Sequence, residues 1–121
     1  MQDFRKLNVW QRSHTWTKAI FQMASRIPGR QRFILSDQIC RSSSSVPTNI
    51  VEGTARQSDR ETARFLEIAA SSAAETEYHL ELIIDLNLLP IAELKATQQE
   101  AVVIRKMLNA FIGRLRNPQP H

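Results

Sequence analysis

The chain has 121 residues, of which 42% are hydrophobic and 23% are charged, a composition that excludes a disordered or fibrous protein. This length supports one hydrophobic core and excludes a second full domain, and so short a chain gains buried surface by self-association. Three glycines and five prolines are too few for a turn-rich β-sandwich, so we expect an all-α fold.

Cysteine content and hydropathy bear on the cellular compartment. The single Cys40 cannot form an internal disulfide. The longest apolar run, Ala101 to Ile104, is far too short for a membrane span, and no apolar stretch follows the charged N-terminus as it would in a signal peptide. We therefore expect a cytoplasmic protein that does not bind membranes.

The net charge of +4 is unevenly distributed along the chain. Lys and Arg outnumber Asp and Glu by 11 to 5 in residues 1–66 and by 4 to 0 in residues 101–121, whereas residues 67–100 hold 1 cation and 7 acids. Twelve of the sixteen cations are Arg, whose planar guanidinium suits phosphate contacts. Two interpretations stay open here: solvated faces with ion pairs between helices, or a surface for nucleic acid.

Apolar residues spaced three and four apart predict two helices in the first half of the chain. The first spans residues 7–27 and is ended by Pro28-Gly29. The second begins at Ser36, whose side chain is a good N-cap, and ends at Gly53.

Pro47 lies inside the second of these helices. A proline there removes one backbone donor and clashes with the preceding turn, at a cost of about 3 kcal/mol in a regular helix. We expect a kink near Ser43, with serine side chains satisfying the freed carbonyl groups.

The clearest local signal in the second half is the capping box Ser58-Asp59-Arg60-Glu61, which begins a third helix running to about Leu86. Pro90 suits the first turn of a fourth helix, which keeps the same apolar spacing to Leu115. Short connections make neighbouring helices antiparallel, which predicts an up-down-up-down four-helix bundle.

This bundle is expected to form a single domain over residues 1–116. Residues 117–121 contain two prolines and are expected to be a frayed tail.

The patterns typical of catalytic and metal-binding sites do not occur in the sequence. A di-iron bundle needs Glu-x-x-His on inward faces, which the sequence lacks. His14, His79 and His121 lie on separate segments without ligand spacing, which favours hydrogen-bonded core or surface histidines. A G-x-S-x-G elbow and the glycine-rich nucleotide loops are also missing. We expect no enzymatic activity, no metal and no cofactor.

Polar residues that the apolar pattern does not need gather around Pro47 and on the third helix, and we expect a structural polar network there. Its members are Arg41, Ser45, Asn49, Glu52, Arg56, Ser72 and Glu75. A network that satisfies the kinked helix and a contact to a ligand or phosphate both fit this pattern. Glu77, Glu81 and Asp85 form an acidic row at i, i+4 spacing, which is either solvated or faced by cations of another helix or subunit.

Several strings of the sequence carry a family resemblance. They are DFRKLNVWQ at 3–11, Gln38 with Arg41, SVPTNIVEG at 45–53 followed by Arg56, FLEIA at 65–69 with Ser72 and Glu75, and Met107-Leu108-Asn109. With these strings the chain resembles the small bacterial four-helix-bundle family of proteins encoded within intervening sequences of 23S ribosomal RNA. The related accessory variability proteins of diversity-generating retroelements share the resemblance, which covers nearly the whole chain.

The resemblance implies a left-handed up-down bundle that assembles into a ring, commonly a pentamer, with a basic outer surface. In the ribosomal members it implies RNA binding, and in the retroelement relatives a platform for nucleic acid and a reverse transcriptase. It supplies no catalytic residue.

Together with the arginine-rich ends, the resemblance predicts a non-enzymatic homo-oligomer that binds RNA or DNA by charge. The expected nucleic-acid-binding residues are Arg26, Arg30, Arg32, Arg56, Arg60, Arg64, Arg105, Arg114 and Arg116. The alternative is an oligomeric protein-interaction scaffold, such as a reverse-transcriptase accessory protein, with incidental affinity for nucleic acid.

Overall fold

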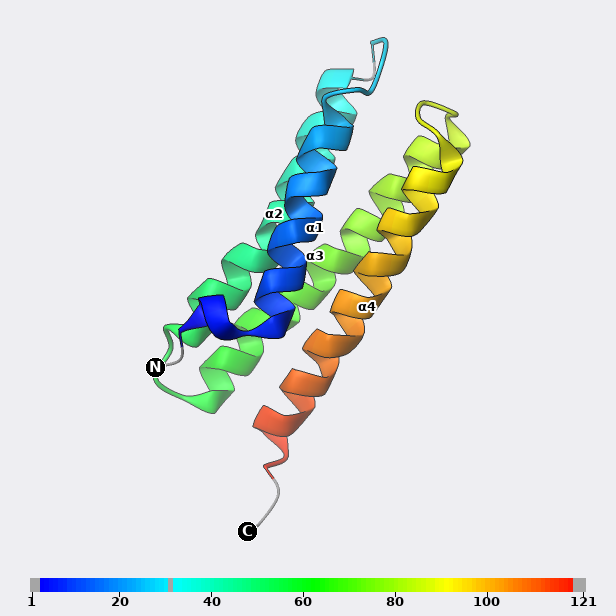
Figure 1. Cartoon of the computed structure of the whole chain (residues 1–121). Helices are drawn as coiled ribbons and strands as arrows, with labels where there is room; N and C mark the ends of the chain where they lie inside the picture. Colours follow the sequence, from blue (N-terminus) through cyan, green and yellow to red (C-terminus); the bar gives the residue numbers. More distant parts are fainter. Residues whose placement is uncertain (1–2, 31, 119–121) are drawn as a thin grey trace.

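The computed structural model of the chain describes residues 3–30 and 32–118, and over these residues it contains helices and no strands. The elements are the short 3-10 helix η1 (Phe4–Lys6) and the helices α1 (Asn8–Ala24), α2 (Arg32–Thr54), α3 (Asp59–Asp85) and α4 (Ile91–Arg116). The four long helices run alternately up and down side by side (Figure 1). The predicted all-α four-helix bundle is confirmed.

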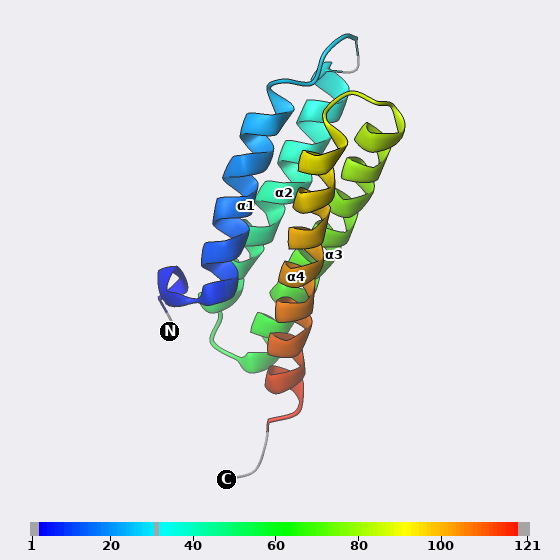
Figure 2. The ribbon, with the colours of Figure 1, turned by 45° about the vertical axis from the view of Figure 1, so that its right-hand side comes forward.

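The two ends of the bundle differ in what they carry. Figure 2 shows the α1–α2 and α3–α4 connections at one end, which we call the α1–α2 end. The α2–α3 connection and both chain termini lie at the opposite end, which we call the α2–α3 end. None of the helices in residues 3–30 and 32–118 has the length and hydropathy needed to span a bilayer.

The predicted start of the second helix is wrong by one turn. Helix α2 begins at Arg32, so Ser36 lies in its second turn and does not cap it. Gly29 adopts a positive φ of 77°, which turns the chain sharply after Pro28. The Arg32 amide then donates to the Gly29 carbonyl at 3.4 Å, and the chain enters the helix earlier than the cap signal indicated.

The other boundaries lie close to their predicted positions. Helix α1 ends at Ala24; Ser25 and Arg26 form a turn, and Ile27 lies outside both helix and turn. Ser58 caps α3 as predicted, because its side chain accepts from the Glu61 amide at 3.2 Å. Pro90 is the residue just before α4. Of the predicted tail, Asn117 and Pro118 lie beyond α4, and 119–121 fall outside the described residues.

The core is a continuous set of side chains from all four helices. Ile20 of α1, Ile50 of α2, Leu66 and Leu80 of α3 and Ile104 of α4 are fully buried. Burying one such side chain contributes roughly 1.5–3 kcal/mol, so the apolar stripes account for the association of the helices.

Pro47 is accommodated without interrupting α2, which is helical on both sides of it. Because Pro47 has no N–H, the Ser43 carbonyl lacks the i+4 amide donor of a regular helix. The hydroxyl of Thr17 on α1 reaches this carbonyl at 3.1 Å, and both residues are buried. The prediction that serine side chains would satisfy the freed carbonyl is wrong, since a threonine of the neighbouring helix does so.

Candidate nucleic-acid interface

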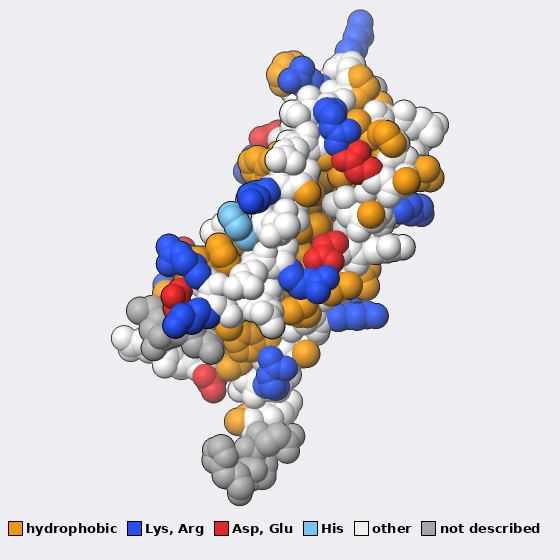
Figure 3. Space-filling model, viewed as in Figure 1, with side chains coloured by type: hydrophobic (Ala, Val, Ile, Leu, Met, Phe, Trp, Pro, Cys, Tyr) orange, Lys and Arg blue, Asp and Glu red, His pale blue; other side chains and the backbone are white. Residues whose placement is uncertain are grey.

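The antiparallel helices gather most of the predicted arginines at the two ends of the bundle. The α1–α2 end carries Arg26, Arg30 and Arg32. The α2–α3 end carries Arg56, Arg60, Arg64, Arg114 and Arg116, and Arg105 lies along α4 between the ends. Figure 3 shows Lys and Arg side chains at both ends and along the visible face, with acidic side chains beside several of them.

Three of the predicted arginines make ion pairs that join two helices. Arg26 forms a bidentate ion pair with Glu93, which links the end of α1 to α4. Arg105 contacts Glu77 of α3 at 2.7 Å, and Arg116 contacts Glu67 of α3 at 2.5 Å. Hydrogen bonds to these acids raise the pKa of Arg26 and of Arg105 above the ordinary arginine value.

The same kind of pair joins α1 to α4 through a residue outside the predicted set. Arg12 contacts Glu100 at 2.7 Å, and the Trp16 indole N–H donates to the Thr97 carbonyl at 3.1 Å. These pairs agree with the first interpretation of the charge pattern, because much of the Arg content holds helices together. A partly exposed pair of this kind contributes little, typically about 0–1 kcal/mol.

Three further predicted arginines lie over aromatic rings: Arg56, Arg114 and Arg32, the last of which lies over Phe33. The Arg56 guanidinium is 5.1 Å from the centroid of Phe65 and also pairs with Glu52 at 3.5 Å. Arg114 is 5.5 Å from the centroid of Phe111. Contact with a ring holds a guanidinium in place without neutralising its charge.

The remaining cations are available for an external anion. Within residues 3–30 and 32–118, no carboxylate lies at ion-pair distance from any of five arginines: Arg30, Arg32, Arg60, Arg64 and Arg114. Arg60 and Arg64 line a polar surface recess with Ser58 and Arg116. Two acids, Glu61 and Glu67, share its rim, so the recess has a mixed but cation-rich lining.

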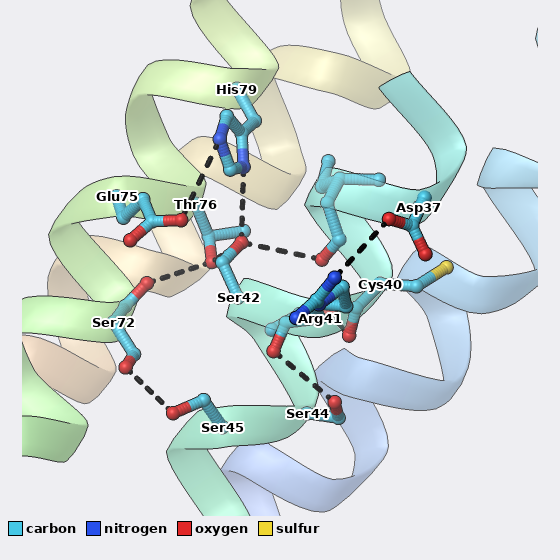
Figure 4. A network of polar contacts seen from close by, with 12 residues as sticks. Asp37, Cys40, Arg41, Ser42, Ser44, Ser45, Ser72, Glu75, Thr76 and His79 are labelled. Atoms are coloured by element: carbon cyan, nitrogen blue, oxygen red, sulfur yellow. Dashed lines mark hydrogen bonds and ion pairs between the residues drawn. The ribbon is translucent and has the colours of Figure 1, made fainter. Parts of the chain in front are cut away.

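The predicted polar network is only partly formed. Asn49 donates to the Ser45 hydroxyl at 2.9 Å. Figure 4 shows the next link, the 2.8 Å hydrogen bond between the hydroxyls of Ser45 and Ser72. Arg41 lies outside it and pairs with Asp37 on the exposed face of α2. Glu52 and Arg56 are likewise paired with each other on the surface.

Three residues that sequence reasoning left out complete this network between α2 and α3. Thr76 donates to the Ser42 hydroxyl at 2.8 Å, and Ser42 is hydrogen-bonded to His79 Nδ1 at 3.0 Å (Figure 4). His79 Nε2 faces Glu75 at 3.7 Å, which brings the predicted Glu75 into the network. Thr76 and His79 are three residues apart and therefore lie on the same face of α3. Their partner Ser42 could not be identified from the sequence, because that requires knowing how α2 is rotated about its axis.

His79 is a hydrogen-bonded core histidine, as the sequence predicted. Its side chain is only 8% exposed. Burial lowers the pKa of His79, and the Glu75 carboxylate opposes this by raising it. The Ser42–His79–Glu75 order resembles a hydrolytic triad, but Ser42 is 5% exposed and packed between two helices, so a substrate cannot reach its hydroxyl.

The acidic row of α3 is partly faced by a cation of another helix. Glu77 is the member that pairs with Arg105 of α4, while Glu81 and Asp85 lie toward the surface. In the described part of the chain, no group of three or more His, Cys, Asp or Glu residues could hold a metal ion. Cys40 is half-buried, and burial raises the pKa of its thiol.

The fold and the surface define an all-α four-helix-bundle protein whose two ends carry arginines with no acidic partner among the described residues. The chain belongs to the family of 23S rRNA-intervening sequence proteins, which it matches over residues 5–110. The resemblance inferred from the sequence strings is thereby confirmed for the ribosomal family.

A solved structure supports the same assignment. The chain is similar to a protein of unknown function from the S23 ribosomal protein family of Bacteroides thetaiotaomicron, with a TM-score of 0.81 and 30% sequence identity. The match covers 86% of this chain and 97% of that one. No curated protein matches the chain significantly. The relation to retroelement accessory proteins stays a prediction.

Proposed function

We propose that this protein is a non-enzymatic RNA-binding bundle that contacts the phosphate backbone by charge and does not read base sequence. The family to which it belongs is described by its link to 23S rRNA. Binding to ribosomal RNA would place the protein in the cytoplasm. Binding a phosphate backbone by charge does not require a closed pocket. The recess at the α2–α3 end is open and lined by side chains of both charges, which agrees with this function.

The observation that carries the proposal is the set of arginines without an ion-pair partner in the described chain. Arg60 and Arg64 lie one turn apart on α3 and have no such partner in the described chain, and Arg116 of α4, which pairs with Glu67, lines the same recess. Guanidinium groups one helical turn apart can contact neighbouring phosphates, because their planar forks match phosphate oxygens.

Self-association belongs to the proposal, because one copy offers only a few such contacts. We propose that copies assemble into a ring, a pentamer, so that the same cluster recurs around the particle. Light scattering should then give a particle about five times the chain mass of 13.9 kDa. A single-chain mass at micromolar concentration contradicts the ring.

The test of RNA binding uses the salt dependence of affinity. Binding to a fragment of ribosomal RNA and to an unrelated RNA of equal length should be similar, and should weaken linearly on a log–log plot against salt. The double variant Arg60→Gln, Arg64→Gln should make that plot less steep, by about 0.7–0.9 for each phosphate that these arginines neutralise in the wild-type protein.

A matched control is Lys18→Gln, Lys95→Gln, which removes the same charge from exposed positions that do not line the recess of Arg60 and Arg64. It should leave the slope of the salt plot nearly unchanged. Binding that ignores salt, or no binding to either RNA at low salt, would overturn the proposal. Unchanged affinity in the arginine variant, with the oligomer intact, would favour the protein-interaction scaffold.

A further inference from the structure

The most exposed large hydrophobic side chain of the described chain lies at the α1–α2 end. Phe33, in the first turn of α2, is 80% exposed, and Phe21 of α1 is 48% exposed. Both line a surface recess with the hydroxyl-bearing Ser25 and Ser36 and with Cys40. Covering an exposed apolar ring with another surface lowers the free energy, because it removes apolar area from water. We therefore expect a partner for this site.

The charge around the recess indicates the chemistry of that partner. The Arg32 guanidinium lies 5.9 Å from the centroid of the Phe33 ring and has no carboxylate at ion-pair distance in the described chain. Asp37 also lines the recess, but it pairs with Arg41. Arg30 is exposed in the connection just before α2. Apolar and basic side chains lie next to one another at this end in Figure 3.

A flat aromatic ring with the Arg32 guanidinium beside it, and a second exposed arginine, Arg30, close by in the chain, matches the two parts of a nucleotide. The planar face of an unpaired base can stack on the ring, and the phosphates on either side of it can contact the cations. A duplex uses only the cations, because its bases are already stacked and the deep, narrow groove of A-form RNA does not admit side chains.

We propose that the α1–α2 end binds single-stranded RNA, with an unpaired base stacked on Phe33 and neighbouring phosphates contacted by Arg30 and Arg32. This inference rests on the proposed RNA binding and adds the strandedness of the ligand and the residue that selects it. Phe21 and the hydroxyls of Ser25 and Ser36 would line the side of the recess that the base enters.

The test compares a single-stranded RNA of about 12 nucleotides with a duplex of the same sequence, by fluorescence anisotropy at fixed salt. Phe33→Ala should weaken binding of the single strand by about 5- to 150-fold, which corresponds to the loss of one base stack. Binding of the duplex should change little. The salt slope for the single strand should stay the same, because no cation has been removed.

Two controls separate stacking from general hydrophobicity. Phe33→Tyr keeps a stacking ring and should retain the affinity, and Ile34→Ala removes the exposed apolar neighbour and should also retain it. Both positions are solvent-exposed, so these variants are expected to fold, and light scattering checks the mass of each.

Different results overturn different statements. If the wild-type protein binds both RNAs but Phe33→Ala binds them unchanged, or weakens both equally, the stacking inference is wrong while the proposed function stands. If Phe33→Ala lowers the particle mass and leaves single-strand affinity per particle unchanged, Phe33 belongs to a contact between copies and the stacking inference is again wrong. If the wild-type protein binds neither RNA at low salt, the proposed function itself fails.

Discussion

The hydrogen bond between Thr17 and the carbonyl of Ser43 is the interaction whose removal is easiest to interpret. Replacing Thr17 by Val keeps the shape of the side chain and removes only the hydroxyl. The Thr17 hydroxyl also lies 2.7 Å from the Ser13 carbonyl, but that carbonyl is within α1 and keeps its helical donor. The single hydroxyl proton is shared between the two carbonyl groups, at 2.7 Å and 3.1 Å. Only the Ser43 carbonyl lacks an i+4 amide donor, and Ser43 is fully buried, so the larger part of the effect falls on Ser43.

The magnitude follows from what remains after the change. A buried carbonyl left without a donor costs about 1–3 kcal/mol, so Thr17→Val should lower the free energy of unfolding by that amount. The measurement is guanidinium unfolding at fixed protomer concentration, with an unchanged m-value. Thr15→Val, on the exposed side of α1, is the matched control and should stay within about 0.5 kcal/mol of the wild type.

A second background isolates the role of Pro47. Pro47→Ala restores a backbone N–H one turn after Ser43, which can then donate to the same carbonyl. In that background Thr17→Val should cost clearly less, giving a coupling free energy of about 1 kcal/mol or more. An equal cost of Thr17→Val in both backgrounds would refute the idea that the threonine replaces the donor that proline removes.

Two further predictions concern glycine packing and the buried histidine. Gly53→Ala should destabilise the protein by about 1–3 kcal/mol, because the added Cβ would lie 3.2 Å from Phe65 Cβ and 3.3 Å from a backbone oxygen. Gly113→Ala, with nothing within 4 Å, should instead stabilise by up to about 1 kcal/mol, and destabilisation by both changes in thermal unfolding would contradict this account. Burial lowers the pKa of His79 in the folded protein. Below about pH 6.5 the unfolded chain therefore binds more protons than the folded protein, and the free energy of unfolding should decrease as the pH falls. His79→Gln should flatten the dependence of unfolding free energy on pH in that range, and an identical slope in both proteins would show that His79 is not responsible.

The helical framework could be predicted from the sequence because its determinants are local. Apolar spacing, the Ser58 cap and the positions of Pro28 and Pro90 act within a few residues, and they place α3 and the start of α4 almost correctly. The predicted start of α2 is wrong because a good capping residue, Ser36, competes with an earlier turn at Gly29. A local signal cannot decide between two such starts.

The partners of polar and charged side chains depend on how the helices pack. Arg12 and Glu100 are 88 residues apart, and Ser42 and His79 are 37 apart, so no local pattern links them. Their pairing depends on how each helix is rotated about its axis when the cores interlock. The same rotation places Thr17 against Ser43.

Periodicity and composition act along the chain, and they suffice to specify four amphipathic helices with arginine-rich ends. Packing of the bundle then settles which of the described arginines are neutralised by neighbouring acids and which have no acidic partner among the described residues. That division depends on distances of a few ångströms between residues of different helices, and it selects Arg60, Arg64 and the Phe33 recess for experiment.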